Sequence, residues 1–160
     1  MTRPFNETES NRQLEGSVLK AYLTARGRGK YSYITMPPGS PFDAVGISNW
    51  AGKNYTWPIE VKCRNVNHDA YGTLILSARK VYALIEAPHT IGATHGSVLL
   101  VRWNDVIGEI PMSEAELSYM KGPVPGGRRD RGQPGDVEDV MHINISRSEL
   151  MKGVDVPPWL

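Results

Sequence analysis

The sequence predicts an α/β domain in which a mixed central sheet is flanked by helices. An amphipathic helix pattern near the N-terminus is followed by three runs rich in β-branched and aromatic residues, which are typical of strands. A second helix pattern and two further strand runs come next. Because helices and strands are mixed along one chain in this order, the sequence favours an α/β architecture.

The first helix is expected over residues 10–26. Ser10 and Gln13 form a capping-box pair at its start, and Gly27 follows its end. Its apolar stripe consists of Leu14, Val18, Leu19, Tyr22 and Leu23. Glu15 falls inside this stripe at helical spacing, so we expect its carboxylate to be directed inward.

Three strands are expected after this helix, over residues 31–36, 42–47 and 55–63. Residues 48–54 contain Asn and Gly and are typical of a hairpin loop. Pro58 has no N–H group, so regular pairing of the third strand should begin after it, or this part should lie at a sheet edge.

The middle of the chain predicts a second helix and two more strands. Ser77 can cap a helix that ends at Pro88. Strands are expected over residues 97–103 and 106–111, followed by a short helix over residues 113–120.

The C-terminal part is expected to contain a long flexible loop and one further strand. Residues 121–137 combine Gly, Pro and Arg with almost no apolar content, which disfavours an ordered core element. Residues 138–160 should form a C-terminal strand and a tail whose Trp159 indole docks on the protein. We expect one domain over residues 1–160, with its core at about residues 6–112.

Composition narrows the compartment and the class of site. The single cysteine, Cys63, excludes an intramolecular disulfide and zinc sites built on four cysteines, or on two cysteines with two histidines. The N-terminus lacks the apolar core of a signal peptide, and no stretch approaches the roughly 18 apolar residues of a membrane span. We therefore expect a soluble protein in a reducing cytoplasm, with no membrane partner.

Charge is sorted by region, although 18 Lys plus Arg nearly balance 17 Asp plus Glu. Residues 62–80 are mainly basic, whereas residues 104–119 carry four acidic residues and no basic one. A basic surface beside carboxylates suits an enzyme that binds and cuts a polyanion, and an ordinary solvated surface would explain the same charges.

Asp43 and Glu60 are the expected ligands of a catalytic metal ion. Magnesium prefers oxygen ligands, so two carboxylates and the backbone carbonyl of Val61 would make an adequate protein site. Glu60 and Lys62 stand at i and i+2 on a strand and therefore share one face. A lysine there can orient the attacking water and stabilise charge on the phosphate, and Glu15 would face the same site from the first helix.

Residues 41–43 (Pro-Phe-Asp) and 59–62 (Ile-Glu-Val-Lys) resemble the PD-(D/E)XK nuclease superfamily, which includes type II restriction enzymes and archaeal Holliday junction resolvases. The order of elements over about residues 6–112 is similar as well. The resemblance implies a restriction-endonuclease-like core and hydrolysis of phosphodiester bonds in DNA with Mg²⁺ or Mn²⁺. It also implies a phage or prokaryotic setting, and hence the cytoplasm of a prokaryotic or phage-infected cell.

The resemblance also implies roles for individual residues. Asp43 resembles the metal-binding aspartate of the family, Glu60 its second carboxylate and Lys62 its lysine, while Glu15 resembles the helix glutamate of many members. Two features depart from the pattern. The proline stands two residues before Asp43 instead of next to it, and residues 77–80 read Ser-Ala-Arg-Lys where many members show a glutamine.

Arg64, Arg79 and Lys80 are the expected contacts to DNA phosphates, and solvated surface roles would explain them equally well. The alternative functions are a nucleic-acid-binding module without catalysis and a virion or protein-interaction component on the same fold. A homodimer would suit paired cuts in two strands, although no segment specifies one. The sequence leaves open whether the substrate is a junction, a duplex, a flap, a single strand or RNA.

Simpler interpretations stand beside the catalytic ones. Glu60 and Lys62 could form a solvated charge pair on an exposed sheet, and Glu15 could be a buried partner of Arg12 or of a tyrosine. The histidines lack the paired spacing of metal ligands and are expected in loops or on the surface. They are His68, His89, His95 and His142.

Overall fold

The computed structural model describes residues 9–27, 30–127 and 137–159. Its helices are α1 (Glu9–Gly27) and α2 (Ala78–Ile91), with short 3-10 helices η1 (Glu114–Tyr119) and η2 (Ile145–Arg147). Its strands are β1 (Tyr31–Thr35), β2 (Ala44–Trp50), β3 (Lys53–Cys63), β4 (Thr73–Ser77), β5 (Ser97–Arg102), β6 (Ile107–Met112), β7 (Met120–Gly127), β8 (Val137–Asn144) and β9 (Glu149–Leu150). Within these ranges no helix has the length and apolar content needed to cross a membrane.

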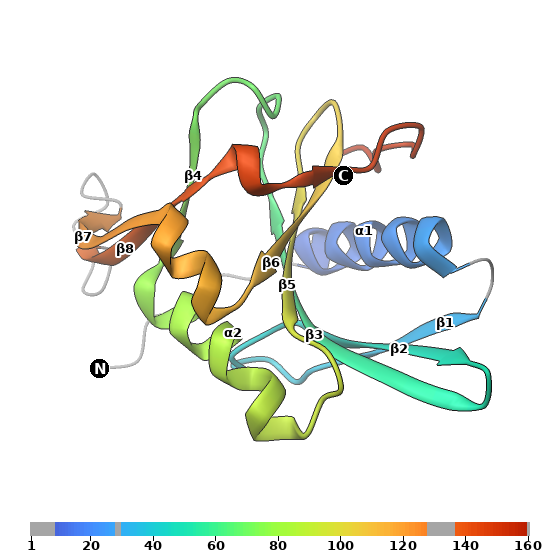
Figure 1. Ribbon diagram of the computed structural model, residues 1–160. Helices are drawn as coiled ribbons and strands as arrows, with labels where there is room; N and C mark the ends of the chain where they lie inside the picture. Colours follow the sequence, from blue (N-terminus) through green and yellow to red (C-terminus); the bar gives the residue numbers. More distant parts are fainter. Residues whose placement is uncertain (1–8, 28–29, 128–136, 160) are drawn as a thin grey trace.

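Six strands form the central sheet, in the order β1-β2-β3-β5-β6-β9 (Figure 1). β3 and β5 run parallel at its centre, from the pair Ile59 and Val98 to the pair Cys63 and Arg102. All other neighbouring strands of this sheet are antiparallel. The α/β fold class with a mixed central sheet is therefore confirmed.

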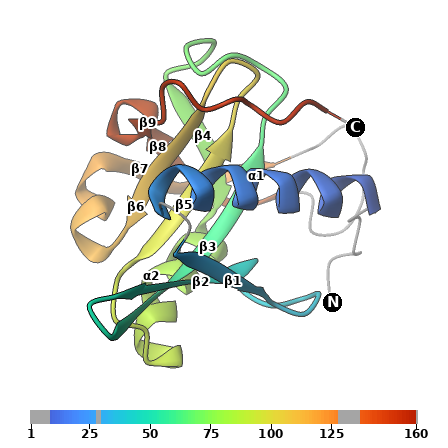
Figure 2. The same ribbon diagram turned by 90° about the vertical axis from the view of Figure 1, so that its right-hand side faces the viewer.

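The two faces of the central sheet carry different layers. α1 crosses one face of the sheet (Figure 2). Its apolar stripe packs there on Ile59 and Val61 of β3. α2 and a second sheet, in the order β4-β8-β7, cover the other face. Because successive side chains of a strand point to opposite faces, Glu60 and Lys62 emerge on the α2 side.

The second sheet corrects the expectation for the C-terminal part. β7 pairs with β8 from Met120 and Ile143 to Gly127 and Val137, so the loop expected over residues 121–137 is wrong for residues 121–127 and for residue 137. Residues 128–136 of that loop lie outside the described part of the chain. Backbone hydrogen bonds to β8 hold β7, so a Gly- and Pro-rich strand with few apolar side chains can still form.

α2 continues past Pro88, where the sequence predicted its end. A proline cannot donate to the carbonyl four residues earlier, which here belongs to Leu84. The buried Ser97 hydroxyl at the start of β5 donates to that carbonyl instead. The helix then ends at Gly92, whose φ of 66° is left-handed. A donor from another element thus replaces the missing helical bond.

The β2–β3 hairpin is longer than predicted, with its turn at Ala51 and Gly52. Pro58 pairs with Val45 inside the β2–β3 ladder, whereas pairing between β3 and β5 begins only at Ile59. The prediction that regular pairing begins after Pro58 therefore holds for the β3–β5 ladder but not for the β2–β3 ladder. Pro58 has no N–H group to donate to β5. β2 starts at Ala44, two residues later than predicted.

The C-terminal tail docks on the protein through its indole, as the sequence predicted. Trp159 Nε1 donates to Asn104 Oδ1 at 2.9 Å, and the Arg102 guanidinium lies 5.0 Å from the Trp159 ring centroid. The tail is thereby fixed to the loop that follows β5.

Candidate active site

Asp43 lies immediately before β2 and is bonded to β3 through its backbone and its side chain. Its N–H donates to the Ile59 carbonyl at 3.0 Å, and its Oδ2 accepts the Val61 N–H at 2.8 Å. Regular β2–β3 pairing ends at Ala44 and Ile59. The Asp43 carboxylate therefore accepts the Val61 N–H in place of a further backbone carbonyl of the ladder. Residues 41–43 and 59–62 thus lie side by side.

Glu60 is buried on the α2 side of the sheet, with 1% of its surface exposed. Lys62 Nζ lies 3.3 Å and Lys80 Nζ 3.1 Å from its Oε1. Its Oε2 is buried and has no hydrogen-bond partner among the described residues. Because Glu60 is out of solvent, the alternative of a solvated charge pair does not describe it.

Burial, followed by the negative charge of Asp43, raises the pKa of Glu60 from 4.5 to about 6. Lys62 and Lys80 lower this pKa, but they do not offset the two raising effects. The carboxyl group is therefore ionised at neutral pH and becomes protonated in mildly acidic solution. A perturbed carboxyl beside a second carboxylate and two lysines is typical of functional sites.

These oxygen atoms fit a divalent cation. A strand residue directs its N–H and C=O to the same side, so the Val61 carbonyl faces the side on which Asp43 accepts the Val61 N–H. Two carboxylates and a carbonyl are hard oxygen donors of the kind that magnesium and manganese bind. The orphaned Oε2 of Glu60 supplies the strongest argument, because a buried ionised oxygen is costly until a cation meets it.

Glu15 lies half-buried on α1, on the opposite side of the sheet from Glu60. Burial and then the charge of Glu15 raise the pKa of the Cys63 thiol from 9.0 to about 11. Cys63 is the last residue of β3, so Glu15 approaches the end of the strand that carries the motif. Its contribution to the metal site stays a prediction.

The three expected DNA-binding cations lie in different environments. Arg64 is half-buried, its guanidinium donates to the carbonyls of Cys63 (3.3 Å) and Ile75 (3.2 Å), and burial lowers its pKa. Arg79 is exposed near the start of α2. Lys80 belongs to the Glu60 cluster. Its contact depends on the packing of α2 against β3, for which the sequence has no local signal.

A second group of possible metal ligands lies in two loops at the ends of β3 and β5. One ligand atom each from His68, Asp69 and Asp105 lie within 4.8 Å of one another. His68 Nδ1 lies 2.6 Å from Asp105 Oδ2, and the backbone N–H of His68 donates to Asp105 Oδ1 at 2.9 Å. The sequence analysis missed this group, because Asp105 comes from a distant loop. Asp69 and Asp105 are exposed, and His68 is half-buried.

Comparisons with known proteins identify a family and a similar fold. A family model described as "Phage putative PDDEXK endonuclease" matches residues 1–151. The solved structure of Hjc, a Holliday junction resolvase from Archaeoglobus fulgidus, is similar with a TM-score of 0.51 and 18% identity, over 84% of this chain and 88% of that chain. At this identity the likeness concerns the fold. No curated protein matches the sequence.

Proposed function

This chain belongs to the phage PDDEXK endonuclease family, and from that premise we propose that it hydrolyses phosphodiester bonds in DNA with bound Mg²⁺ or Mn²⁺. The observation that carries the proposal is the buried Glu60, whose Oε2 has no hydrogen-bond partner among the described residues and whose neighbour is Asp43. The proposal treats residues 1–160 as one nuclease domain, acting in the cytoplasm of the infected cell.

In this proposal Asp43 and Glu60 hold the cation through carboxylate oxygens, together with the Val61 carbonyl. When bound, a divalent cation supplies a more nucleophilic water, relief of charge on the scissile phosphate and help for the leaving oxygen. Lys62 is about one-third exposed and shares the face of Glu60, so its ammonium can donate to the attacking water or to a phosphate oxygen.

Lys80 keeps a positive charge beside Glu60 Oε1, which favours the ionised carboxylate needed for metal binding. Glu15 assists from the α1 side of the sheet, where it approaches the end of β3, and Arg64 and Arg79 contact phosphates along the bound DNA. Arg79 is the more accessible of these two arginines, because the Arg64 guanidinium already donates to backbone carbonyls.

For the substrate we propose branched DNA, with a four-way junction as the first choice. The support is the fold likeness to a Holliday junction resolvase together with the family of phage endonucleases. A homodimer would place two such sites for paired cuts on opposite strands. Neither the substrate structure nor the dimer is needed for the proposed chemistry at Asp43 and Glu60.

Cleavage assays test the proposal directly. The purified protein is incubated with labelled junction, duplex, flap and single-stranded DNA in Mg²⁺, Mn²⁺ or EDTA. We expect metal-dependent cleavage that Asp43→Asn, Glu60→Gln and Lys62→Met each reduce at least about 100-fold. Glu86→Gln on the exposed side of α2 and Lys152→Met in the tail are matched controls and should cleave normally.

Gel-shift measurements in EDTA complete the experiment. The three site variants should retain DNA affinity close to that of the natural protein. Undiminished cleavage by Glu60→Gln or Lys62→Met would refute the site. DNA binding without any turnover would identify a non-catalytic module instead, and absence of both would favour an interaction protein.

A further inference from the structure

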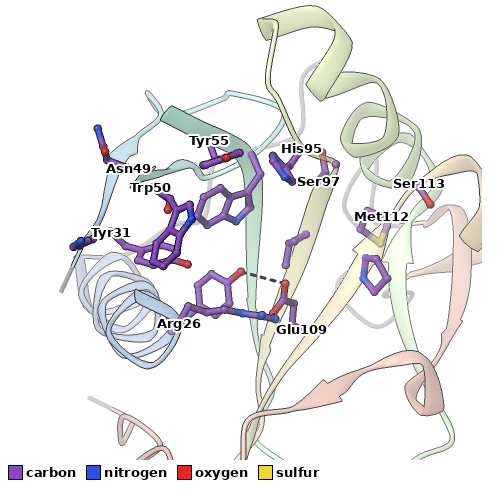
Figure 3. A pocket seen from close by; sticks show the side chains of 17 residues that line it. Arg26, Tyr31, Asn49, Trp50, Tyr55, His95, Ser97, Glu109, Met112 and Ser113 are labelled. Carbon is purple, nitrogen blue, oxygen red and sulfur yellow. Dashed lines mark hydrogen bonds and ion pairs between the residues drawn. The ribbon is translucent and has the colours of Figure 1, made fainter. Parts of the chain in front are cut away.

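A pocket of about 950 Å³ lies on the face of the central sheet opposite the Glu60 cluster. It is open to solvent on one side and is bordered by the end of α1, the β1–β2–β3 strands, the start of β5 and part of β6 (Figure 3). Tyr55 and His95 lie on one side of it, and Arg26 and Glu109 lie on the other. None of its lining residues belongs to the proposed nuclease site.

Aromatic rings dominate this pocket. Tyr31 and Trp57 meet edge to face at a centroid distance of 5.9 Å, and Tyr55 and His95 do so at 5.2 Å. Trp50 remains 62% exposed, which is unusual for the largest apolar side chain. Edge-to-face contacts fix the rings of the four paired residues, while the exposed indole of Trp50 is available to a planar ligand.

The position of Trp57 depends on a glycine in the neighbouring strand. A Cβ atom at Gly46 would lie 2.6 Å from the Trp57 ring, so only glycine lets the indole pack directly on β2. The Trp57 ring thereby forms part of the pocket lining.

The charges of the pocket favour an anionic group at its opening. Lys30 Nζ lies 5.9 Å from the Trp50 ring centroid, and no carboxylate of the described residues pairs with it. Arg26 pairs with Glu109, and the Tyr22 hydroxyl donates to Glu109 at 3.2 Å. The opening therefore carries an available cation, whereas the Glu109 carboxylate inside is already neutralised and can still accept hydrogen bonds.

We propose that this pocket binds a nucleotide, with its base stacked on Trp50 and its phosphate at Lys30. A planar neutral base suits the aromatic lining, and a phosphate suits the Lys30 ammonium, with which no carboxylate in the described part of the chain pairs. The volume lies within the usual range of small-molecule sites, about 300–1,000 Å³. An organic cation would suit the rings equally well, but the Lys30 ammonium beside Trp50 would repel it. The nucleotide can be free or can be an unpaired residue of a DNA strand.

Calorimetric titration in EDTA tests the proposal without requiring cleavage. The probes are dAMP, 2-deoxyribose 5-phosphate, a short single strand and a blunt duplex. Trp50→Ala should weaken binding of dAMP or of the single strand about 5- to 150-fold, the usual effect of losing one stacking partner. Lys30→Gln should weaken binding of dAMP but leave unchanged the binding of 2′-deoxyadenosine, a fifth probe that lacks the phosphate. Trp159→Ala, which removes another exposed indole outside the pocket, is the matched control and should bind normally.

The outcomes separate the two sources of the nucleotide. Binding of dAMP supports a free nucleotide, whereas binding of the single strand alone, weakened by Trp50→Ala, supports an unpaired base of DNA. No binding of either, equal affinity for 2-deoxyribose 5-phosphate, or unchanged affinity in Trp50→Ala would overturn the proposal. Glu60→Gln should bind these probes normally, so failure of the nuclease proposal and failure of this one are distinguishable.

Discussion

Replacing Glu60 by glutamine should stabilise the metal-free protein at neutral pH, although the same change removes the proposed activity. Glutamine has the shape of the protonated carboxyl group and carries no charge. The ionised carboxylate is buried beside Asp43 and has one oxygen without a partner among the described residues. Its removal therefore relieves an unfavourable charge instead of breaking a favourable one.

The magnitude follows from the pKa of Glu60, which burial and Asp43 raise from 4.5 to about 6. A raised carboxyl pKa means that the folded protein binds this proton more tightly than the unfolded chain. The resulting stability is complete below pH 4.5 and is lost as the pH rises through 6. At about 1.4 kcal/mol per pH unit, the loss at pH 7.5 amounts to about 2 kcal/mol.

Thermal and urea unfolding between pH 4 and pH 8 in EDTA measure this difference. At pH 7.5 the free energy of unfolding of Glu60→Gln should exceed that of the natural protein by about 2 kcal/mol. For a chain of this size this corresponds to a Tm that is higher by roughly 4–8 °C. The two proteins should converge near pH 4.5. Glu86→Gln, the same change at an exposed position of α2, should match the natural protein at every pH.

Two further measurements test the cause. Mg²⁺ should stabilise the natural protein at pH 7.5 more than it stabilises Glu60→Gln, because the cation binds the ionised carboxylate. Lys80→Met removes a charge that lowers the Glu60 pKa, so the stabilisation by Glu60→Gln should be larger in that background. Arg79→Met is the neighbouring control and should leave the stabilisation by Glu60→Gln unchanged. Equal or lower stability of Glu60→Gln at pH 7.5 in EDTA would refute the reasoning.

Two predictions concern the fold. Gly46→Ala places a Cβ against the Trp57 indole packed on β2 and should destabilise the protein by about 1–3 kcal/mol in urea unfolding. Gly16→Ala in α1, whose added Cβ meets nothing within 4 Å, should instead stabilise it by about 0.5–1 kcal/mol. Unchanged stability of Gly46→Ala would contradict the packing of Trp57 on β2. Ser97→Ala deprives the Leu84 carbonyl of its donor and should cost about 1–3 kcal/mol. Pro88→Ala should restore most of that loss by supplying a backbone N–H, and equal losses with and without Pro88 would disprove this account.

The motif and its shared face could be predicted from the sequence, because they depend on local physics. Side chains two residues apart on a strand share a face whatever the rest of the fold does. That rule places Glu60 and Lys62 together, and the length of chain between Asp43 and Glu60 allows a hairpin that brings Asp43 beside them. The family resemblance rested on the same short segments.

Local patterns misjudged the elements whose partners lie elsewhere in the chain. β7 is poor in apolar side chains and forms because β8 supplies its backbone hydrogen bonds. α2 continues through Pro88 because Ser97, on another strand, donates to the Leu84 carbonyl. Sequence periodicity cannot report hydrogen bonds made between distant segments. The sequence alone therefore predicts a loop in place of β7 and an earlier end for α2.

The chemistry of Glu60 depends on tertiary packing as well. The period-two pattern placed its carboxylate on one side of β3, but its burial comes from the layers that α2 and the second sheet add to that face. Lys80 reaches it only because α2 docks there. A pKa depends on solvent exclusion and on charges within a few ångströms, and neither exists until the chain has folded.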